Sequence, residues 1–183
     1  MMEWLMALDG DILMFIQENI RSGILTPIFT AVTTLGNSGI VWGIISLLLL
    51  ISKRTRKAGV MSLLALLVSL LINNVTLKNL VARVRPYETI EGLVPLISRP
   101  WDYSFPSGHT GSSFASAWVL YRTLPKRFGT PALILAGLIG LSRLYLGVHF
   151  PTDVLFGVIS GIFSGFVAEV LVNKVSAKKG LWH

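Results

Sequence analysis

Residues 58–77 of the chain read AGVMSLLALLVSLLINNVTL, an apolar run that is nearly free of polar side chains until Asn73 and Asn74. A helix must supply about 20 apolar residues to cross a hydrocarbon core of ~30 Å. The run has this length and carries no acidic or basic residue. It predicts a membrane-spanning helix and makes the expected fold all-α.

Four more apolar segments are bounded by polar or charged residues: residues 38–52, 110–124, 130–146 and 152–172. The last is long enough to span a bilayer, and the other three reach that length with a turn from their neutral flanks. In the last segment Gly157, Gly161 and Gly165 recur at every fourth position, which lets helix backbones approach closely in lipid. We expect a single domain over residues 1–183, an integral membrane helical bundle of five or six transmembrane helices.

The composition agrees with a lipid environment. Of the 183 residues, 52% are hydrophobic and 14% are charged, whereas a soluble domain carries about 25% charged residues. The net charge of +7 lies mostly at the ends of apolar segments, so we predict membrane topology and no nucleic-acid partner. The absence of cysteine excludes disulfides and thiolate chemistry. The first charges along the chain are acidic, which argues against a cleavable signal peptide.

Residues 1–37 are less regular. Apolar side chains recur there at helical spacing with polar ones between them: Trp4, Leu5, Leu8, Ile12, Phe15, Ile16 and Ile20, interspersed with Asp9, Asp11, Glu18 and Asn19. This pattern predicts an amphipathic helix lying in the membrane interface. The alternative is that residues 24–35, which are too short to span alone and contain Pro27, pair with this helix as a sixth, imperfect span.

Lys and Arg are distributed unequally between the two ends of the segments. One side has ten cations: Lys53, Arg54, Arg56, Lys57, Arg122, Lys126, Arg127, Lys174, Lys178 and Lys179. The other side also has acidic residues, and only five cations: Lys78, Arg83, Arg85, Arg99 and Arg143. Because cations favour the cytoplasmic side, we predict a multi-pass protein of a bacterial-type cell membrane with a cytoplasmic C-terminus. The loops at residues 78–109 and 143–153 then face the extracytoplasmic side.

Those outer loops hold three polar clusters. In the first, KNLVARVRP at residues 78–86, Lys78 and Arg85 are about two helical turns apart and share a face if the helix continues to Pro86. Anchoring of a helix end is the alternative, but positive charge is disfavoured as an anchor on the outer side. Two fixed cations on one face are typical of an anion clamp.

The second cluster, SFPSGHT at residues 104–110, precedes a predicted helix. Pro106 and Gly108 allow a tight turn, after which the unpaired backbone N–H groups of the first helical turn can point at an anion. His109 is placed to donate a proton to a leaving oxygen. A simple turn with an exposed histidine is the alternative.

The third cluster is SRLYLGVHFPTD at residues 142–153. Asp153 falls in the first turn of the last predicted helix, four residues after His149. There it could accept a hydrogen bond from one ring nitrogen of His149 and leave the other as a nucleophile. A helix-dipole charge at Asp153 and a lone polar residue at His149 are the alternatives, but they leave the convergence of Arg143 with the other cations unexplained.

Together the clusters have the spacing Lys-x6-Arg-Pro, Pro-Ser-Gly-His and Ser-Arg-x5-His-x3-Asp. The chain in this respect resembles the type 2 phosphatidic acid phosphatase superfamily, membrane lipid phosphatases related to vanadium haloperoxidases and bacterial acid phosphatases. The motifs cover residues 78–153, and the short chain is similar to the bacterial branch with phosphatidylglycerophosphate phosphatase B and undecaprenyl diphosphate phosphatases.

The resemblance implies a metal-independent reaction through a phosphohistidine, without a cofactor, in a catalytic bundle at residues 38–177. His149 would attack phosphorus, Asp153 would orient His149, and His109 would protonate the leaving oxygen. The phosphoryl oxygens would be held by the other matched positions: Lys78, Arg85, the Ser107 hydroxyl, the Gly108 amide and Arg143.

Two functions from different classes follow as hypotheses. The first is a lipid phosphatase acting at the outer membrane face on phosphatidylglycerophosphate, phosphatidic acid or undecaprenyl diphosphate. The second is a membrane protein that binds or transports phosphate or a lipid phosphate without catalysis. The absence of an internal repeat and of interrupted mid-membrane helices argues against transport.

The loop at residues 86–104 is expected to cap the site. Its aromatic side chains fit either an interfacial belt or the route by which a lipid reaches the site: Tyr87, Trp101 and Tyr103. Arg83 and Arg99 fall outside the matched positions. We interpret them as charge partners of the nearby acids: Glu88, Glu91 and Asp102.

Overall fold

The computed structural model describes residues 2–179, which are mostly helical and contain no strand. The elements in chain order are α1 (Met2–Phe15), η1 (Ile16–Ile20), α2 (Leu25–Leu35), η2 (Asn37–Gly39), α3 (Ile40–Ile51), α4 (Arg56–Ser69), η3 (Leu70–Leu77), α5 (Lys78–Val81), α6 (Pro86–Thr89), α7 (Gly108–Thr123), α8 (Lys126–Tyr145) and α9 (Pro151–Lys179).

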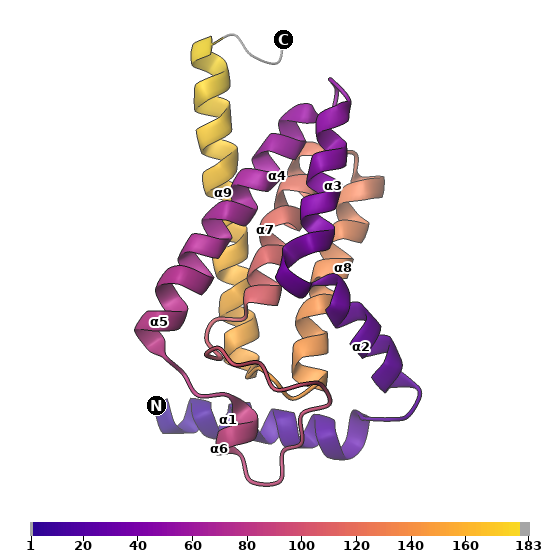
Figure 1. Cartoon of the computed structure of the whole chain (residues 1–183), viewed down its shortest axis with the longest axis vertical. Helices are drawn as coiled ribbons and strands as arrows, with labels where there is room; N and C mark the ends of the chain where they lie inside the picture. The colour runs from indigo at the N-terminus through magenta and orange to yellow at the C-terminus, as the bar shows by residue number, and fades with distance from the viewer. Residues whose placement is uncertain (1, 180–183) are drawn as a thin grey trace.

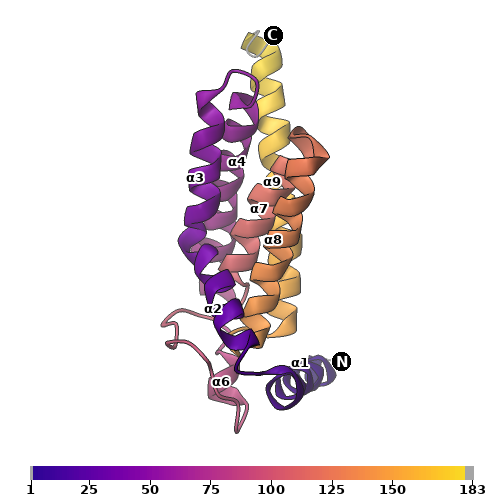
Figure 2. The ribbon, with the colours of Figure 1, turned by 90° about the vertical axis from the view of Figure 1, so that its right-hand side faces the viewer.

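The helices α3, α4, α7, α8 and α9 run along the long axis of the molecule, and α1 lies across one end (Figures 1 and 2). The loops that carry the three polar clusters lie at the α1 end, while the turns after α3 and α7 lie at the opposite end, as does the last turn of α9 (Figure 1). The cation-rich and motif-bearing loops are therefore separated by the length of the bundle.

Helix α7 occupies the centre of the bundle and packs against α4, α8 and α9. Small side chains such as Ala115 and Ala117 let its neighbours approach, and each is fully buried. Trp42 of α3 donates from its indole nitrogen to the Ser113 hydroxyl at 2.9 Å, and the Ser62 hydroxyl lies 2.7 Å from that of Ser116. Hydroxyl bonds of this kind hold helices together where the surrounding lipid provides no hydrophobic driving force.

The lengths and compositions of the helices confirm an all-α membrane bundle. Three segments of the described chain are long and apolar enough to cross a bilayer: residues 56–89, 126–145 and 151–178. The pair α2 and α3 together would make a fourth span, bent by 42°. Helix α7, with 16 residues, is shorter than these segments.

The bend between α2 and α3 gives residues 24–35 a different neighbour from the expected one, while their position in the membrane stays a prediction. We expected these residues to lie in the interface or to pair with the first helix, but α2 continues into α3 through residues 36–39. Ser38 and Gly39 have positive φ angles of 50° and 66°, which break the helical path. The interfacial position of α1 itself stays a prediction, consistent with its orientation across the end of the bundle (Figure 2).

The helix of residues 58–77 also ends differently from the prediction. It passes through the π-helical segment η3 and finishes with α5 at Val81, where Ala82 adopts a left-handed conformation with φ of 48°. Residues 83–85 are not helical. The prediction that Lys78 and Arg85 share one helix face is therefore wrong. Pro86 begins the short helix α6 instead of ending the long one.

Candidate active site

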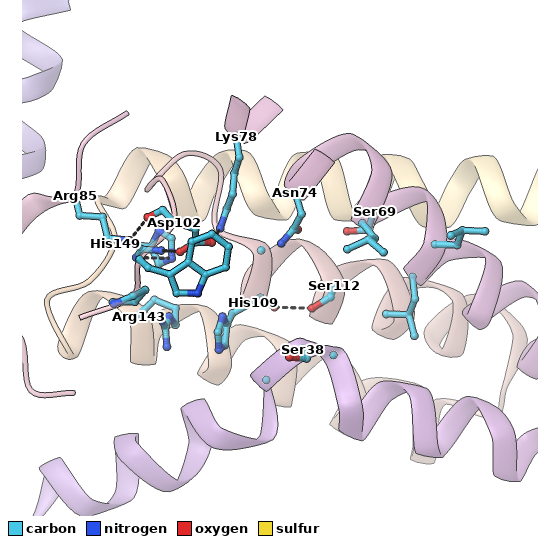
Figure 3. A pocket seen from close by; sticks show the side chains of 18 residues that line it. Ser38, Ser69, Asn74, Lys78, Arg85, Asp102, His109, Ser112, Arg143 and His149 are labelled. Carbon is cyan, nitrogen blue, oxygen red and sulfur yellow. Dashed lines mark hydrogen bonds and ion pairs between the residues drawn. The ribbon is translucent and has the colours of Figure 1, made fainter. Parts of the chain in front are cut away.

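The three sequence clusters meet in one cavity of about 540 Å³. Five of the predicted side chains line it: Lys78, Arg85, His109, Arg143 and His149. They converge from separate elements on a common space near Asp102 (Figure 3). The same cavity continues along α4 and η3, past Asn74 and Ser69, where leucines also line it: Leu66, Leu67 and Leu70. It thus joins a cationic end to an apolar groove.

Lys78 and Arg85 hold the carboxylate of Asp102 between them. Nη2 of Arg85 lies 2.5 Å from Oδ1 of Asp102, and Lys78 forms an ion pair with Oδ2. The Lys78 and Arg85 side chains are only 8% and 4% exposed. Burial raises the pKa of Asp102, but its bond to Lys78 and the charges of Lys78 and Arg85 lower that pKa by more, to below its ordinary value. The sequence had suggested that Asp102 balances the charge of Arg83 or Arg99. In the structure, Asp102 instead pairs with Lys78 and Arg85.

Arg85 reaches the cavity from a non-helical segment. Its Nη1 donates to the carbonyl of Val148 at 2.7 Å, and its Nε donates to the carbonyl of Asp102 at 2.8 Å. Nη1 also lies 3.4 Å from Nε2 of His149. These bonds fix the guanidinium beside one ring nitrogen of the histidine although no helix positions it.

The start of α7 places Gly108 and His109 at the cavity, and Ser107 behind it. The Ser107 hydroxyl caps the helix, accepting a bond from the hydroxyl of Thr110 at 2.9 Å, and Ser107 is fully buried. Ser107 does not line the cavity in the described structure. A Cβ atom on Gly108 would lie 3.1 Å from the Asn74 amide, so glycine eases the approach of α7 to η3.

His109 makes a contact that the sequence did not indicate. Its Nε2 lies 2.9 Å from Oδ1 of Asn37, a residue of the bend between α2 and α3. If Nε2 carries a proton, its N–H donates a hydrogen bond to Oδ1 of Asn37, and Nδ1 is then the ring nitrogen with a free lone pair. The bend therefore contributes to the orientation of the His109 ring.

Arg143 lies in the last turn of α8 and is 2% exposed. Its Nη1 donates to the hydroxyl of Thr33, in α2, at 2.6 Å. Its Nε has no hydrogen-bond partner among the described residues. A buried donor without a partner is uncommon in proteins, and here it belongs to a side chain that lines the cavity.

His149 and Asp153 face each other at the start of α9. Nδ1 of His149 lies 3.5 Å from Oδ2 of Asp153, which is within ion-pair distance but longer than a good hydrogen bond. Burial lowers the pKa of His149 to about 3; the charges of Arg85 and Arg143 add to this effect, and Asp153 opposes it. The ring is therefore neutral at pH 7 and has a lone pair available.

Arg83 is the residue that sequence interpretation missed. Its guanidinium lies 2.7 Å from Oδ1 of Asp153 and 2.8 Å from Oδ2 of Asp9. The acids of the 86–104 loop are not its partners, so its interpretation as their counter-charge is wrong. Asp9 was assigned to the polar face of an amphipathic helix, yet it is 2% exposed. The contact of Arg83 with Asp9 and Asp153 could not be predicted from the sequence, because no regular spacing relates the three residues.

The aromatic residues of the capping loop differ in burial and in their contacts. Tyr87 is buried and donates to the carbonyl of Pro100 at 3.0 Å, while the guanidinium of Arg99 lies 5.3 Å from its ring centroid. Trp101 is 98% exposed and also lines the cavity. Trp101 therefore lies at the cavity, whereas Tyr87 packs the loop; a role of Trp101 in lipid entry stays a prediction.

Comparison with known proteins identifies the family. A profile of the PAP2 superfamily matches residues 58–176, a range that contains every site residue predicted from the sequence. The chain belongs to the PAP2 superfamily.

Individual relatives of this PAP2 protein are similar over most of its length. It is 34% identical over 139 residues to an undecaprenyl-diphosphatase of Sulfolobus acidocaldarius, covering 76% of the chain and 67% of that relative. It is 32% identical over 169 residues to phosphatidylglycerophosphatase B of Bacillus subtilis, covering 85% and 79%. Its fold matches the crystal structure of a transmembrane PAP2-type phosphatidylglycerolphosphate phosphatase from Bacillus subtilis, with a TM-score of 0.75 and 32% identity over 93% of the chain and 87% of that structure.

These findings confirm three of the sequence-based predictions. The chain has the all-α membrane fold of the superfamily, it is a multi-pass membrane protein, and it is a lipid phosphatase. An enzyme is thereby favoured over the non-catalytic binding or transport protein that formed the second hypothesis.

Proposed function

We propose that this PAP2 protein hydrolyses a phosphate monoester or a diphosphate of a membrane lipid through a phosphohistidine on His149. The observation that carries the proposal is the anion site, in which Lys78 and Arg85 hold a carboxylate next to the histidine. A phosphoryl group in the place of the Asp102 carboxylate would present its phosphorus to Nε2 of His149. The other ring nitrogen, Nδ1, faces Asp153.

The reaction would proceed in two steps. In the first, Nε2 of His149 bonds to phosphorus while the bond from phosphorus to the leaving oxygen breaks, and His109 gives that oxygen a proton. Burial and the neighbouring cations lower the pKa of His109 to about 2, so His109 would acquire this proton together with the anionic substrate, whose charge offsets those cations. In the second, neutral His109 takes a proton from a water molecule whose oxygen attacks phosphorus, and the bond from phosphorus to nitrogen breaks. Inorganic phosphate leaves, and both histidines return to their starting states.

Fixed positive charge would stabilise the negative oxygens of the transition state. Lys78, Arg85 and Arg143 supply it, together with the backbone N–H of Gly108 in the first turn of α7. These cations provide the charge that a metal ion provides in other phosphatases, so the scheme requires no metal. We assign the Ser107 hydroxyl an indirect part, since it caps α7 and so orients the turn that carries Gly108.

The substrate class follows from the apolar groove that continues the cavity. Leu66, Leu67 and Leu70 line it on the side of α4 and η3, so a lipid chain could remain among apolar side chains while its phosphate reaches the histidines. The named activities of the relatives support undecaprenyl diphosphate and phosphatidylglycerophosphate as candidates, and phosphatidic acid shares their chemistry. We propose that the site faces the extracytoplasmic side of the membrane.

The direct test is phosphate release by the full chain in detergent micelles from a panel of three lipids: undecaprenyl diphosphate, phosphatidylglycerophosphate and phosphatidic acid. We expect release from at least one of them, equal with and without a chelator. His149→Ala should reduce the rate by at least about a thousandfold, as for the loss of other covalent nucleophiles.

The matched control is His183→Ala, since His183 is the remaining histidine of the chain; it should retain the wild-type rate. Rapid acid quenching of wild-type enzyme with labelled substrate should trap acid-labile phosphate on the protein, and the His149→Ala protein should trap none. Loss of activity with chelator, or turnover by the His149→Ala protein, would contradict the mechanism.

A further inference from the structure

Arg83 lies between two buried carboxylates from distant parts of the sequence. Its Nη1 lies 2.7 Å from Oδ1 of Asp153, and its Nη2 lies 2.8 Å from Oδ2 of Asp9. The side chains of Asp9 and Asp153 are 3% and 0% exposed, whereas that of Arg83 is 21% exposed. The two acids share one cation, so the charge on either carboxylate affects how strongly Arg83 compensates the other.

Asp9 also binds the start of α9. Its Oδ1 accepts the backbone N–H of Thr152 at 3.0 Å, and its Oδ2 accepts the Thr152 hydroxyl at 2.5 Å. That N–H is one of the first-turn donors that have no partner within a helix. The Thr152 hydroxyl in turn accepts a bond from Nη1 of Arg83 at 2.7 Å. Asp9, Arg83 and Thr152 thus form a closed ring of hydrogen bonds beside Asp153.

Further contacts fix Arg83 and Asp153. The guanidinium of Arg83 lies 3.8 Å from the centroid of the Phe150 ring, and the backbone carbonyl of Arg83 accepts the backbone N–H of Ser104 at 2.8 Å. The Ser104 hydroxyl donates to Oδ2 of Asp153, and the N–H of Phe150 donates to the same oxygen at 2.9 Å. Arg83 therefore holds one oxygen of Asp153 while Ser104 and Phe150 hold the oxygen that faces His149.

We infer that Asp9 and Arg83 are positioning residues of the phosphatase reaction, which set the orientation and charge of Asp153 and through it the basicity of His149. The inference rests on the proposed nucleophilic role of His149. In the described structure neither Asp9 nor Arg83 lines the cavity, so neither would touch the substrate. Asp9 also lies outside the range matched by the PAP2 profile, residues 58–176. Helix α1 is thus an integral part of the catalytic unit.

The electrostatic consequence has a sign that can be measured. The charged and titratable groups around the His149 ring are Asp153 from α9, Arg85, Arg143 from α8 and His109 from α7. Without the charge of Arg83, Asp153 is less compensated, so His149 binds a proton more readily. Without the charge of Asp9, Arg83 compensates Asp153 alone, so His149 binds a proton less readily.

The experiment compares the full chain with Asp9→Asn, Arg83→Gln and the double variant. The matched control is Asp11→Asn, which removes an exposed carboxylate from the same helix. We expect kcat to fall about tenfold in each single variant, equivalent to ~1.4 kcal/mol of transition-state stabilisation, with KM within about twofold of wild type. The acid limb of the pH profile of kcat should move to higher pH in Arg83→Gln and to lower pH in Asp9→Asn. Because the pair acts as a unit, the double variant should be less impaired than the product of the two single effects.

A purely structural contact gives a different pattern. The variants would then melt at lower temperature, but each folded molecule would keep the wild-type kcat and pH profile, and the inference would be overturned. If Arg83→Gln does not fold, Asp9→Asn carries the test, because asparagine has the same shape and can still bind Thr152. Wild-type enzyme that releases no phosphate from any lipid of the panel would instead refute the proposed function. Active wild type with variants indistinguishable from Asp11→Asn would refute this inference alone.

Discussion

At the scale of single residues, Asp102 occupies the position that we assign to a substrate phosphate. Its carboxylate binds both Lys78 and Arg85 in the resting protein. On the proposed mechanism, a phosphate group that enters the site would have to displace it. The capping loop, which brings Asp102 to the cavity, would then compete for the same two cations.

Asp102→Asn should bind substrate more tightly, because asparagine carries no charge to compete for Lys78 and Arg85. We expect KM to fall by about tenfold, which corresponds to ~1.4 kcal/mol, and the inhibition constant of inorganic phosphate to fall in parallel. Steady-state kinetics with the best lipid of the panel measure both quantities. Glu91→Gln, which removes an exposed acid from the same loop, is the matched control and should leave both unchanged. A higher KM would mean that Asp102 organises the cations instead of competing for them.

The site residues that could be predicted are those with a fixed spacing inside one motif. Lys78, Arg85, His109, Arg143 and His149 reach the cavity because each motif ends or begins a helix of the bundle. The partners of these residues, and the partner that Arg83 has in α1, were not predictable, because each comes from a segment without a recognisable motif: Asp102, Asn37, Thr33 and Asp9. Those contacts depend on how α1, the α2–α3 bend and the capping loop fold over the bundle, and local spacing carries no information about this.

At the scale of elements, the packing of α9 on α7 follows the predicted glycine spacing. A Cβ atom on Gly161 would lie 2.6 Å from the carbonyl oxygen of Gly111, and one on Gly157 would lie 2.9 Å from that of Ser107. The backbones approach as the sequence predicted. The bend between α2 and α3 was not predicted, because the residues on either side of it were treated as separate segments. The π-helical segment η3 was not predicted either, since the apolar pattern of its sequence is compatible with an ordinary α-helix.

Gly161→Ala should destabilise the bundle, because the added methyl group would meet backbone that cannot move aside. We expect a loss of about 1–3 kcal/mol, typical of overpacking, seen as a lower midpoint of thermal unfolding in detergent. Gly137→Ala in α8 is the matched control, since a Cβ atom there has nothing within 4 Å. It should be neutral or slightly stabilising, because alanine favours helix. Equal midpoints for the two variants would contradict the proposed close packing.

At the scale of the whole molecule, the two ends differ in chemistry. The end that holds the cavity also holds α1 and the loops with acidic residues, while the turns at the other end, together with the end of α9, carry most of the cations (Figure 1). The structure groups the loops as the sequence pattern did. The orientation of that bundle in a cell follows from the charge distribution alone and remains a prediction.

Single cysteines report this orientation cleanly, because the chain contains none of its own. We expect Ser98→Cys, in the capping loop, to react with a membrane-impermeant maleimide added to intact cells. Ser52→Cys, in the exposed turn after α3 at the opposite end, should react only after the membrane is permeabilised. Both substitutions exchange a hydroxyl for a thiol on an exposed residue, so they form a matched pair. The reverse labelling pattern would place the site in the cytoplasm.

The carboxylate between Lys78 and Arg85 also bears on how such an enzyme avoids inhibition by the ordinary phospholipids of the surrounding membrane. Binding becomes an exchange of one anion for another. The favourable electrostatic free energy of binding therefore depends on how far the negative charge of the incoming headgroup exceeds that of Asp102. An ordinary phosphodiester lipid carries one negative charge and gains little, whereas a terminal phosphate carries about −1.5 to −2 at pH 7. The resident acid would thus act as a threshold that keeps bulk phospholipid out of the site. Vesicles rich in phosphatidylglycerol should accordingly inhibit the Asp102→Asn enzyme more strongly than the wild type.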